Sequence, residues 1–67
     1  KTKLTEYKNG AYALIEKESY PRGMYCIICR DAVGNLIDKV RCDDYRMALD
    51  YYRAFKLMAK LSNWFEL

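Results

Sequence analysis

The apolar residues of this chain follow two different periods, and the change between them falls at Asp43 and Asp44. Before that point, short runs of β-branched and aromatic residues are separated by Gly, Pro and Asn, which is the pattern of strands joined by turns. After it, residues 45–61 contain neither Gly nor Pro and carry apolar side chains three or four positions apart. This second pattern is typical of an amphipathic helix. The chain is therefore predicted to form a small sheet followed by one helix.

The first part of the chain predicts a three-stranded antiparallel meander. Pro21 and Gly23 interrupt the run between the first two strands. Residues 1–10 are polar and end at a turn signal, so we expect a flexible arm there. Residues 11–67 are predicted to form a single α+β domain with the order β-β-β-α, in which the sheet packs on one long C-terminal helix. The strands are expected at Tyr12–Lys17, 24–29 and Leu36–Cys42.

The turn between the last two strands decides which side chains face the helix. Its sequence matches a type I turn with Gly34 in the left-handed conformation, the three-residue loop of a β-hairpin. This turn would place Ile28 opposite Asp38. We expect the more uniformly apolar face in that register to pack on the helix, and this face contains Met24, Cys26, Ile28, Leu36, Val40 and Cys42.

The other, open face of the sheet is a candidate ligand-binding surface. A two-residue loop at Gly34 and Asn35 would flip the second strand relative to the third, but Lys39 and Arg41 point away from the helix in either register. Aromatic rings can stack on bases while cations neutralise phosphate, so the surface could take an anionic ligand, a nucleic acid or a nucleotide. Tyr and Ile on an open sheet are equally suited to a protein partner. The candidate residues are Lys17, Arg22, Tyr25, Ile37, Lys39 and Arg41.

The predicted helix runs from about Tyr45 to Leu61 or slightly beyond, after an N-cap at Asp43 or Asp44. Its apolar arc covers nearly half of the circumference, wider than the ~100° stripe that one sheet requires. The residues expected to face the sheet are Ala48, Tyr52, Phe55 and Ala59. Either the amino-terminal arm or a second copy of the chain would cover the rest, and we expect a homodimer. The predicted interface contains Met47, Ala54, Met58, Leu61, Trp64 and Phe65.

Composition and charge argue against a disordered chain and against a membrane-spanning protein. Sixty-seven residues allow one domain at most, and the 52% apolar and 15% aromatic content argues against a disordered tail. The net charge of +3 lies in residues 1–42, which carry eight basic and five acidic residues, against four and four in residues 43–67. No apolar run approaches the ~20 residues that span a bilayer, and no signal peptide is recognised. We expect a cytoplasmic protein without membrane contact.

The residues that support metal binding or catalysis are sparse. Cys26 and Cys29 have C-x-x-C spacing, but three positions apart on a strand they point to opposite faces, and the chain has no His. We therefore expect reduced structural thiols, no metal and no cofactor. The sequence also shows no Gly-rich phosphate loop and no nucleophile beside a base, so an enzyme is not expected. The expected function is a non-enzymatic interaction module that binds and modulates a protein partner as a homodimer.

A set of spaced residues lies within about residues 20–58: Gly23-Met24-Tyr25, Arg30-Asp31, Gly34, Ala48 and Tyr52. This pattern resembles the three-strand-plus-helix layout of AP2-type and integrase arm-type DNA-binding domains. The resemblance implies a sheet inserted into the major groove of DNA, led by Arg and Trp side chains. Ile28 and Asp38 depart from it, because such domains favour polar or basic readers there, and Trp64 lies at the far end. In size and composition, the chain is also similar to small phage-encoded accessory proteins.

Overall fold

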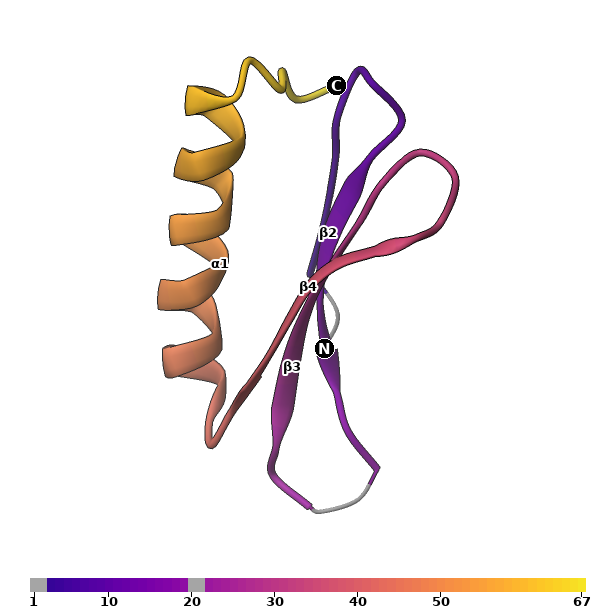
Figure 1. The fold of residues 1–67 in the computed structure, drawn as a ribbon. Coiled ribbons are helices and arrows are strands. Elements are labelled where there is room, and N and C mark those ends of the chain that lie inside the picture. The colour runs from indigo at the N-terminus through magenta and orange to yellow at the C-terminus, as the bar shows by residue number, and fades with distance from the viewer. Residues whose placement is uncertain (1–2, 20–21) are drawn as a thin grey trace.

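The fold is an antiparallel sheet with one helix packed on one of its faces (Figure 1). The computed structural model describes residues 3–19 and 22–67. Its elements are β1 (Lys3–Glu6), β2 (Tyr12–Lys17), β3 (Tyr25–Arg30), β4 (Leu36–Cys42) and α1 (Tyr45–Leu61). Strands that follow one another in the sequence are also neighbours in the sheet, in the order β1-β2-β3-β4. The predicted α+β class, with an antiparallel sheet on a C-terminal helix, is confirmed.

The predicted number of three strands is wrong, because the sheet has four. The additional strand, β1, lies in the segment that was expected to be a flexible arm. It pairs with β2 so that Leu4 is opposite Leu14 and Thr5 is opposite Ala13. The signal at Asn9 and Gly10 is the turn of this hairpin, not the end of an arm. Alternating polar residues concealed the strand, although one of them, Thr5, is buried against the helix side of the sheet.

Gly10 is required at this turn for two reasons. Its φ is +88°, in the left-handed region that side chains disfavour. A Cβ atom built on Gly10 would also lie 2.9 Å from the Cβ of Ala32, in the turn between β3 and β4. The turn between β1 and β2 therefore lies directly against the turn between β3 and β4.

The helix begins and ends where the sequence predicts. The Asp44 carboxylate accepts a hydrogen bond from the Met47 N–H at 2.8 Å, which caps the amino end of α1. At the other end, Asn63 adopts a φ of +63° and the Trp64 N–H donates to the Ala59 carbonyl at 2.8 Å. Among the described residues, no helix combines the length and the apolar content needed to cross a membrane.

The last residues of the chain return to the sheet along β1. The Leu67 N–H donates to the Glu6 carbonyl at 3.0 Å, and the Lys8 N–H donates to the Phe65 carbonyl at 2.8 Å. The Trp64 ring packs edge-on against the Tyr7 ring, with 5.5 Å between the centroids. In Figure 1 this segment is the yellow chain that crosses from α1 towards the first hairpin. The chain's own C-terminal residues thus cover part of the outer edge of the sheet.

The core lies between α1 and the helix-facing side of the sheet. Ala48, Tyr52 and Ala59 are buried there, as predicted, while Phe55 is only half-buried. The alanines allow α1 to approach the strands closely. The Tyr52 hydroxyl is hydrogen-bonded to the Thr5 hydroxyl and lies 3.5 Å from the Ala13 carbonyl oxygen. The sheet contributes Ala13, Ile15, Ile27, Cys29 and Cys42.

The predicted register of the last hairpin is wrong by one residue. The turn itself has the predicted form, because Gly34 has a φ of +95° and its N–H donates to the Asp31 carbonyl at 3.0 Å. Beyond the turn, however, an irregularity of the β-bulge type leaves Ile37 without a cross-strand partner. As a result, Ile28 pairs with Lys39 instead of Asp38.

This shift reverses the predicted orientation of β3. Ile27, opposite Val40, belongs to the core beneath α1, whereas Cys26 and Ile28 lie on the other face. Lys39 and Arg41 still point away from the helix, since they pair with Ile28 and Cys26. The face assignment was therefore correct for Val40 and Cys42. It was wrong for β3 and for Leu36, which pairs with Arg30 before the bulge, because the turn determines the register only as far as that bulge.

Candidate interaction surfaces

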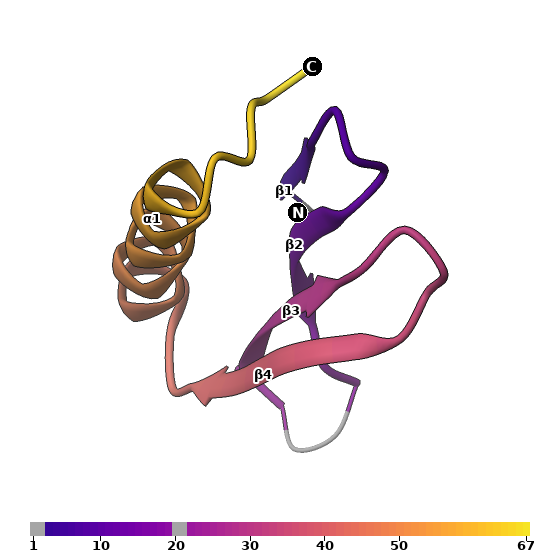
Figure 2. The ribbon, with the colours of Figure 1, turned by 45° about the horizontal axis from the view of Figure 1, so that its top comes forward.

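No described segment covers the face of the sheet opposite α1 (Figure 2). We call this surface the open sheet face. Its centre is apolar, because Leu4 lies opposite Leu14, which in turn lies opposite Ile28 across three strands. The apolar side chains of this face are Leu4, Tyr12, Leu14, Ile28 and Leu36. Of these five, Leu4 and Leu36 are exposed and the other three are partly exposed.

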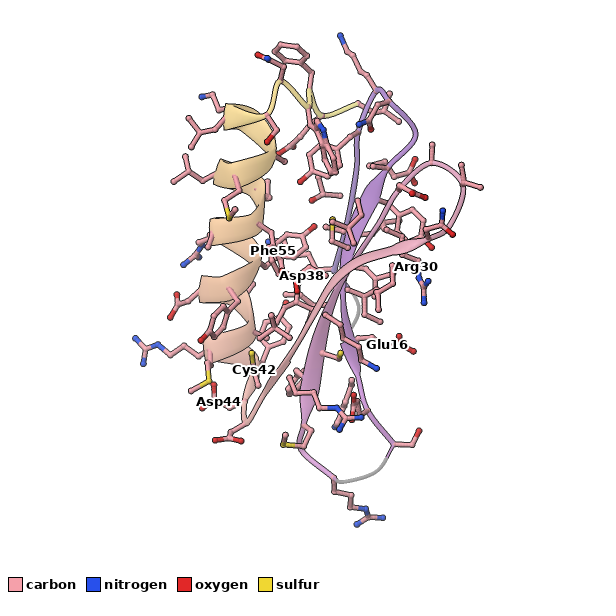
Figure 3. The ribbon with its side chains drawn as sticks, in the orientation of Figure 1. Glu16, Arg30, Asp38, Cys42, Asp44 and Phe55 are labelled. Atoms are coloured by element: carbon pink, nitrogen blue, oxygen red, sulfur yellow. The ribbon has the colours of Figure 1, made fainter. Side chains whose placement is uncertain are left out.

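Charged side chains of both signs surround this apolar centre. Figure 3 shows Glu16 and Arg30 on the side of the sheet away from α1. The Arg41 Nε lies 3.2 Å from the Glu18 Oε1, so one of the predicted cations is already paired. The charged residues of the open sheet face are Glu6, Glu16, Arg30, Lys39 and Arg41, together with Glu18, the partner of Arg41. Three acids beside three cations make a mixed surface, in which phosphate would find no excess positive charge.

The structure separates the six residues predicted to bind a ligand. Lys39 and Arg41 lie on the open sheet face, and Lys17 and Arg22 line a shallow depression at the loop between β2 and β3. Tyr25 instead faces the helix side, where its ring packs edge-on against Tyr45 with 5.3 Å between the centroids.

Ile37, the sixth of these residues, is also removed from the predicted site. It lines a pocket between β4 and α1. No aromatic–basic cluster of the predicted composition is therefore assembled among the described residues. Recognition of an anionic ligand on this face stays a prediction.

A second exposed apolar surface runs along one flank of α1, beside the residues that face the sheet. We call it the α1 stripe, and it contains Met47, Tyr51, Ala54, Met58 and Leu61. All five are exposed, and Leu61 reaches 77%. Successive members are separated by four, three, four and three residues, the spacing of the apolar seam of a coiled coil. The stripe is therefore a continuous apolar line over the whole length of the helix.

Most of the predicted dimer-interface residues lie on this stripe. Met47, Ala54, Met58 and Leu61 are members, whereas Trp64 is half-buried against Tyr7. Phe65 is exposed but belongs to the segment that runs along β1. The prediction did not include Tyr51, although the alternation of four and three in the sequence identifies it.

The two halves of the helical region carry opposite charge. Residues 43–52 contain three Asp and one Arg, a net −2, whereas residues 53–62 contain one Arg and two Lys, a net +3. Asp50 and Arg53 form an exposed ion pair at 3.6 Å, and Lys56 pairs with Glu66 at 3.0 Å. Exposed pairs of this kind contribute little to stability. The helix therefore presents an acidic amino end and a basic carboxyl end beside the α1 stripe.

The thiols are placed for packing. Cys26, Cys29 and Cys42 are free and buried, and Cys26 and Cys29 lie on opposite faces of the sheet, as predicted. Burial raises the pKa of all three thiols above the usual value. They therefore remain protonated at neutral pH, in the less nucleophilic form. Within residues 3–19 and 22–67 there is no cluster of three or more metal-ligating side chains.

No model of a known protein family matches this chain, and no curated protein or solved structure matches it significantly.

Proposed function

We propose that this chain is a non-enzymatic interaction module that self-associates through the α1 stripe and contacts a protein partner as a dimer. The observation that carries the proposal is the second apolar face of α1. The buried residues of α1 already pack against the sheet. The stripe residues stay exposed in a single copy, so they are not part of its core. Apolar surface of this kind gains about 25 cal/mol for each Å² removed from water.

The chemistry of the stripe favours a second copy as its partner. Side chains at alternating spacings of four and three interdigitate with an identical row, and Ala54 near the middle allows two helices to approach closely. The charges favour an antiparallel arrangement, because the acidic amino end of one α1 then lies beside the basic carboxyl end of the other. Antiparallel neighbours also oppose their helix dipoles.

Dimerisation through α1 leaves the open sheet face of each copy available for a protein partner. α1 packs on one face of the sheet, and the open sheet face is the other one (Figure 2). An apolar centre within a rim of mixed charge is typical of protein–protein contacts. This composition supports a protein partner more than a phosphate-bearing one.

Sedimentation equilibrium of wild type and two matched variants tests the proposal. Leu61→Glu places a charge on the stripe, and Val33→Glu makes the same kind of change at a turn residue that is 85% exposed. We expect a dimer for wild type and Val33→Glu at high micromolar concentration. We expect a folded monomer for Leu61→Glu, with an unchanged circular dichroism spectrum. A strictly monomeric wild type, or equal dissociation of both variants, contradicts the proposal.

The antiparallel arrangement can be tested in mixed dimers. A spin label on Lys60→Cys in unlabelled copies should broaden amide signals near Asp50 in ¹⁵N-labelled copies, because the two helix ends then lie side by side. Since the three native thiols are buried and have raised pKa values, the exposed cysteine reacts selectively. Broadening centred on Lys60 itself would instead show a parallel pair.

A further inference from the structure

A half-open pocket lies between β4 and the C-terminal half of α1, within a single copy of the chain. Its volume is about 180 Å³. An apolar cavity of about 150 Å³ holds one benzene molecule, so the pocket has room for a group about as large as one aromatic ring. The residues that line it come from the first hairpin, β3, β4, α1 and the C-terminal segment, and they are mainly apolar. The pocket therefore suits a compact group that carries apolar surface.

Three aromatic residues contribute to the lining of this pocket. Phe55 comes from α1 and Trp64 follows the helix C-cap, and both are half-buried, so each keeps part of its surface accessible. The third, Tyr7, is buried and packs edge-on against Trp64, with 5.5 Å between the ring centroids, which holds the indole in place. Aromatic rings attract cations through the negative charge of their faces. The two accessible rings therefore favour a positively charged group.

The charge of the pocket is also suited to a cation. Of the described residues that line it, Asp38 alone has a charged side chain. Asp38 is the cross-strand partner of Cys29, which lies on the helix side of the sheet, and Figure 3 shows Asp38 and Phe55 in the space between β4 and α1. The Asp38 Oδ1 accepts a hydrogen bond from the Lys39 N–H at 2.8 Å. None of the salt bridges among the described residues includes Asp38, so its negative charge is available to a ligand.

We propose that this pocket binds a quaternary ammonium group, such as the headgroup of a choline-like compound or the end of a trimethylated lysine side chain. The methyl groups of such a cation suit the apolar walls. Its charge is attracted by the rings of Phe55 and Trp64 and by the Asp38 carboxylate. It carries no N–H group that would need a hydrogen-bond acceptor in the pocket. The site does not require the dimer, because all of its residues belong to one copy.

Titration of the ¹⁵N-labelled protein with choline and with 3,3-dimethylbutan-1-ol tests the proposal. The alcohol has the shape of choline, with carbon in place of the charged nitrogen. We expect saturable shifts for choline, centred on the amides of Cys29, Ile37 and Phe55, and about three- to tenfold weaker binding of the alcohol. Equal affinities, choline shifts that do not saturate, or shifts centred on the α1 stripe would overturn the proposal.

Two matched variants test the carboxylate. Asp38→Asn should weaken choline binding about two- to fivefold and leave the affinity for the alcohol unchanged, because it removes the charge at an exposed position and keeps the size of the side chain. Asp43→Asn removes an exposed acid that does not line the pocket, so both affinities should match wild type. Unchanged choline binding in Asp38→Asn, or equal losses in the two variants, would contradict a site at Asp38.

The contribution of the aromatic walls is tested by Phe55→Leu, which keeps an apolar side chain and removes the ring. Once circular dichroism has shown that the variant is folded, its affinity for choline should approach its affinity for the alcohol. A folded variant with the wild-type preference for choline would show that the ring does not contact the cation. The Asp38→Asn titration decides the matter if this variant does not fold.

The source of the ammonium group is distinguished by a capped tripeptide with a central trimethyllysine. Tighter binding of this peptide than of choline indicates a methylated protein as the ligand, and tighter binding of choline indicates a free small cation. The peptide with unmodified lysine should bind more weakly than the trimethylated one, because a primary ammonium group is strongly hydrated. Equal binding of the two peptides would overturn the proposal.

Discussion

The two sides of α1 carry similar side chains in different surroundings. Tyr52 and Ala59 lie against the sheet and are buried, whereas Tyr51 and Ala54 belong to the exposed α1 stripe. Neighbouring tyrosines and nearby alanines of one helix thus form matched pairs that differ in what covers them. The comparison shows that the fold of one copy uses only one of the two apolar sides. The other side remains available for association, which is why polar substitutions on the two sides should have different consequences.

The largest difference between the two sides of α1 is expected when the same charged residue is introduced on each of them. Ala59→Glu places a carboxylate between α1 and the sheet, at a position that is only 7% exposed, so we expect the domain not to fold. Ala54→Glu should fold normally and lose the dimer. Circular dichroism and sedimentation equilibrium check the two outcomes. A folded Ala59→Glu variant would show that α1 is not fixed on the sheet as described.

The adjacent tyrosines test the same comparison by loss of volume. Tyr52→Ala removes a ring that is 1% exposed, together with its bond to Thr5, and should cost roughly 3–5 kcal/mol of unfolding free energy. Tyr51→Ala removes a ring that is 46% exposed and should cost a monomeric copy less than about 1 kcal/mol. Urea unfolding at low protein concentration measures both values. Similar losses for the two variants would contradict the assignment of sides.

Loss of the helix N-cap should lower the stability of α1 by a smaller amount, without affecting one side of the helix more than the other. Asp44→Ala removes the N-cap bond to the Met47 N–H and should lower the free energy of unfolding by about 1 kcal/mol. Once folded, the variant should retain the wild-type dimerisation constant, because Asp44 is not a member of the α1 stripe. Urea unfolding and sedimentation equilibrium measure the two quantities. A change in dimerisation larger than the change in stability would place the cap in the interface.

The helix was predictable because its signals are local. Asp44 caps it, the apolar period runs without interruption, and its bounds at Tyr45 and Leu61 agree with the structure. β1 was missed because its residues are mostly polar, and because the close approach of its hairpin turn, at Gly10, to Ala32 joins positions that are distant in the sequence. The register was missed because the bulge at Ile37 lies beyond the turn that the sequence specifies.

The candidate surfaces were predictable to different degrees for the same reason. The α1 stripe follows from helical spacing alone, so its main residues were found. The pocket requires Tyr7 from the first hairpin, Cys29 from the sheet centre and Phe55 from the helix to meet. No short segment of the sequence contains that information. The open sheet face was intermediate, because Lys39 and Arg41 were placed correctly while Tyr25 was not.

The bulge at Ile37 also limits how copies of this protein can associate. β4 is an edge strand, and exposed edges can recruit strands from other molecules into growing intermolecular sheets and fibrils. Bulges and edge charges oppose such growth, and β4 has both, with Ile37 out of register and Lys39 and Arg41 on the strand. The opposite edge, β1, is partly closed by the chain's own C-terminal residues. Both edges therefore disfavour open-ended polymerisation, whereas pairing through a helix ends at two copies.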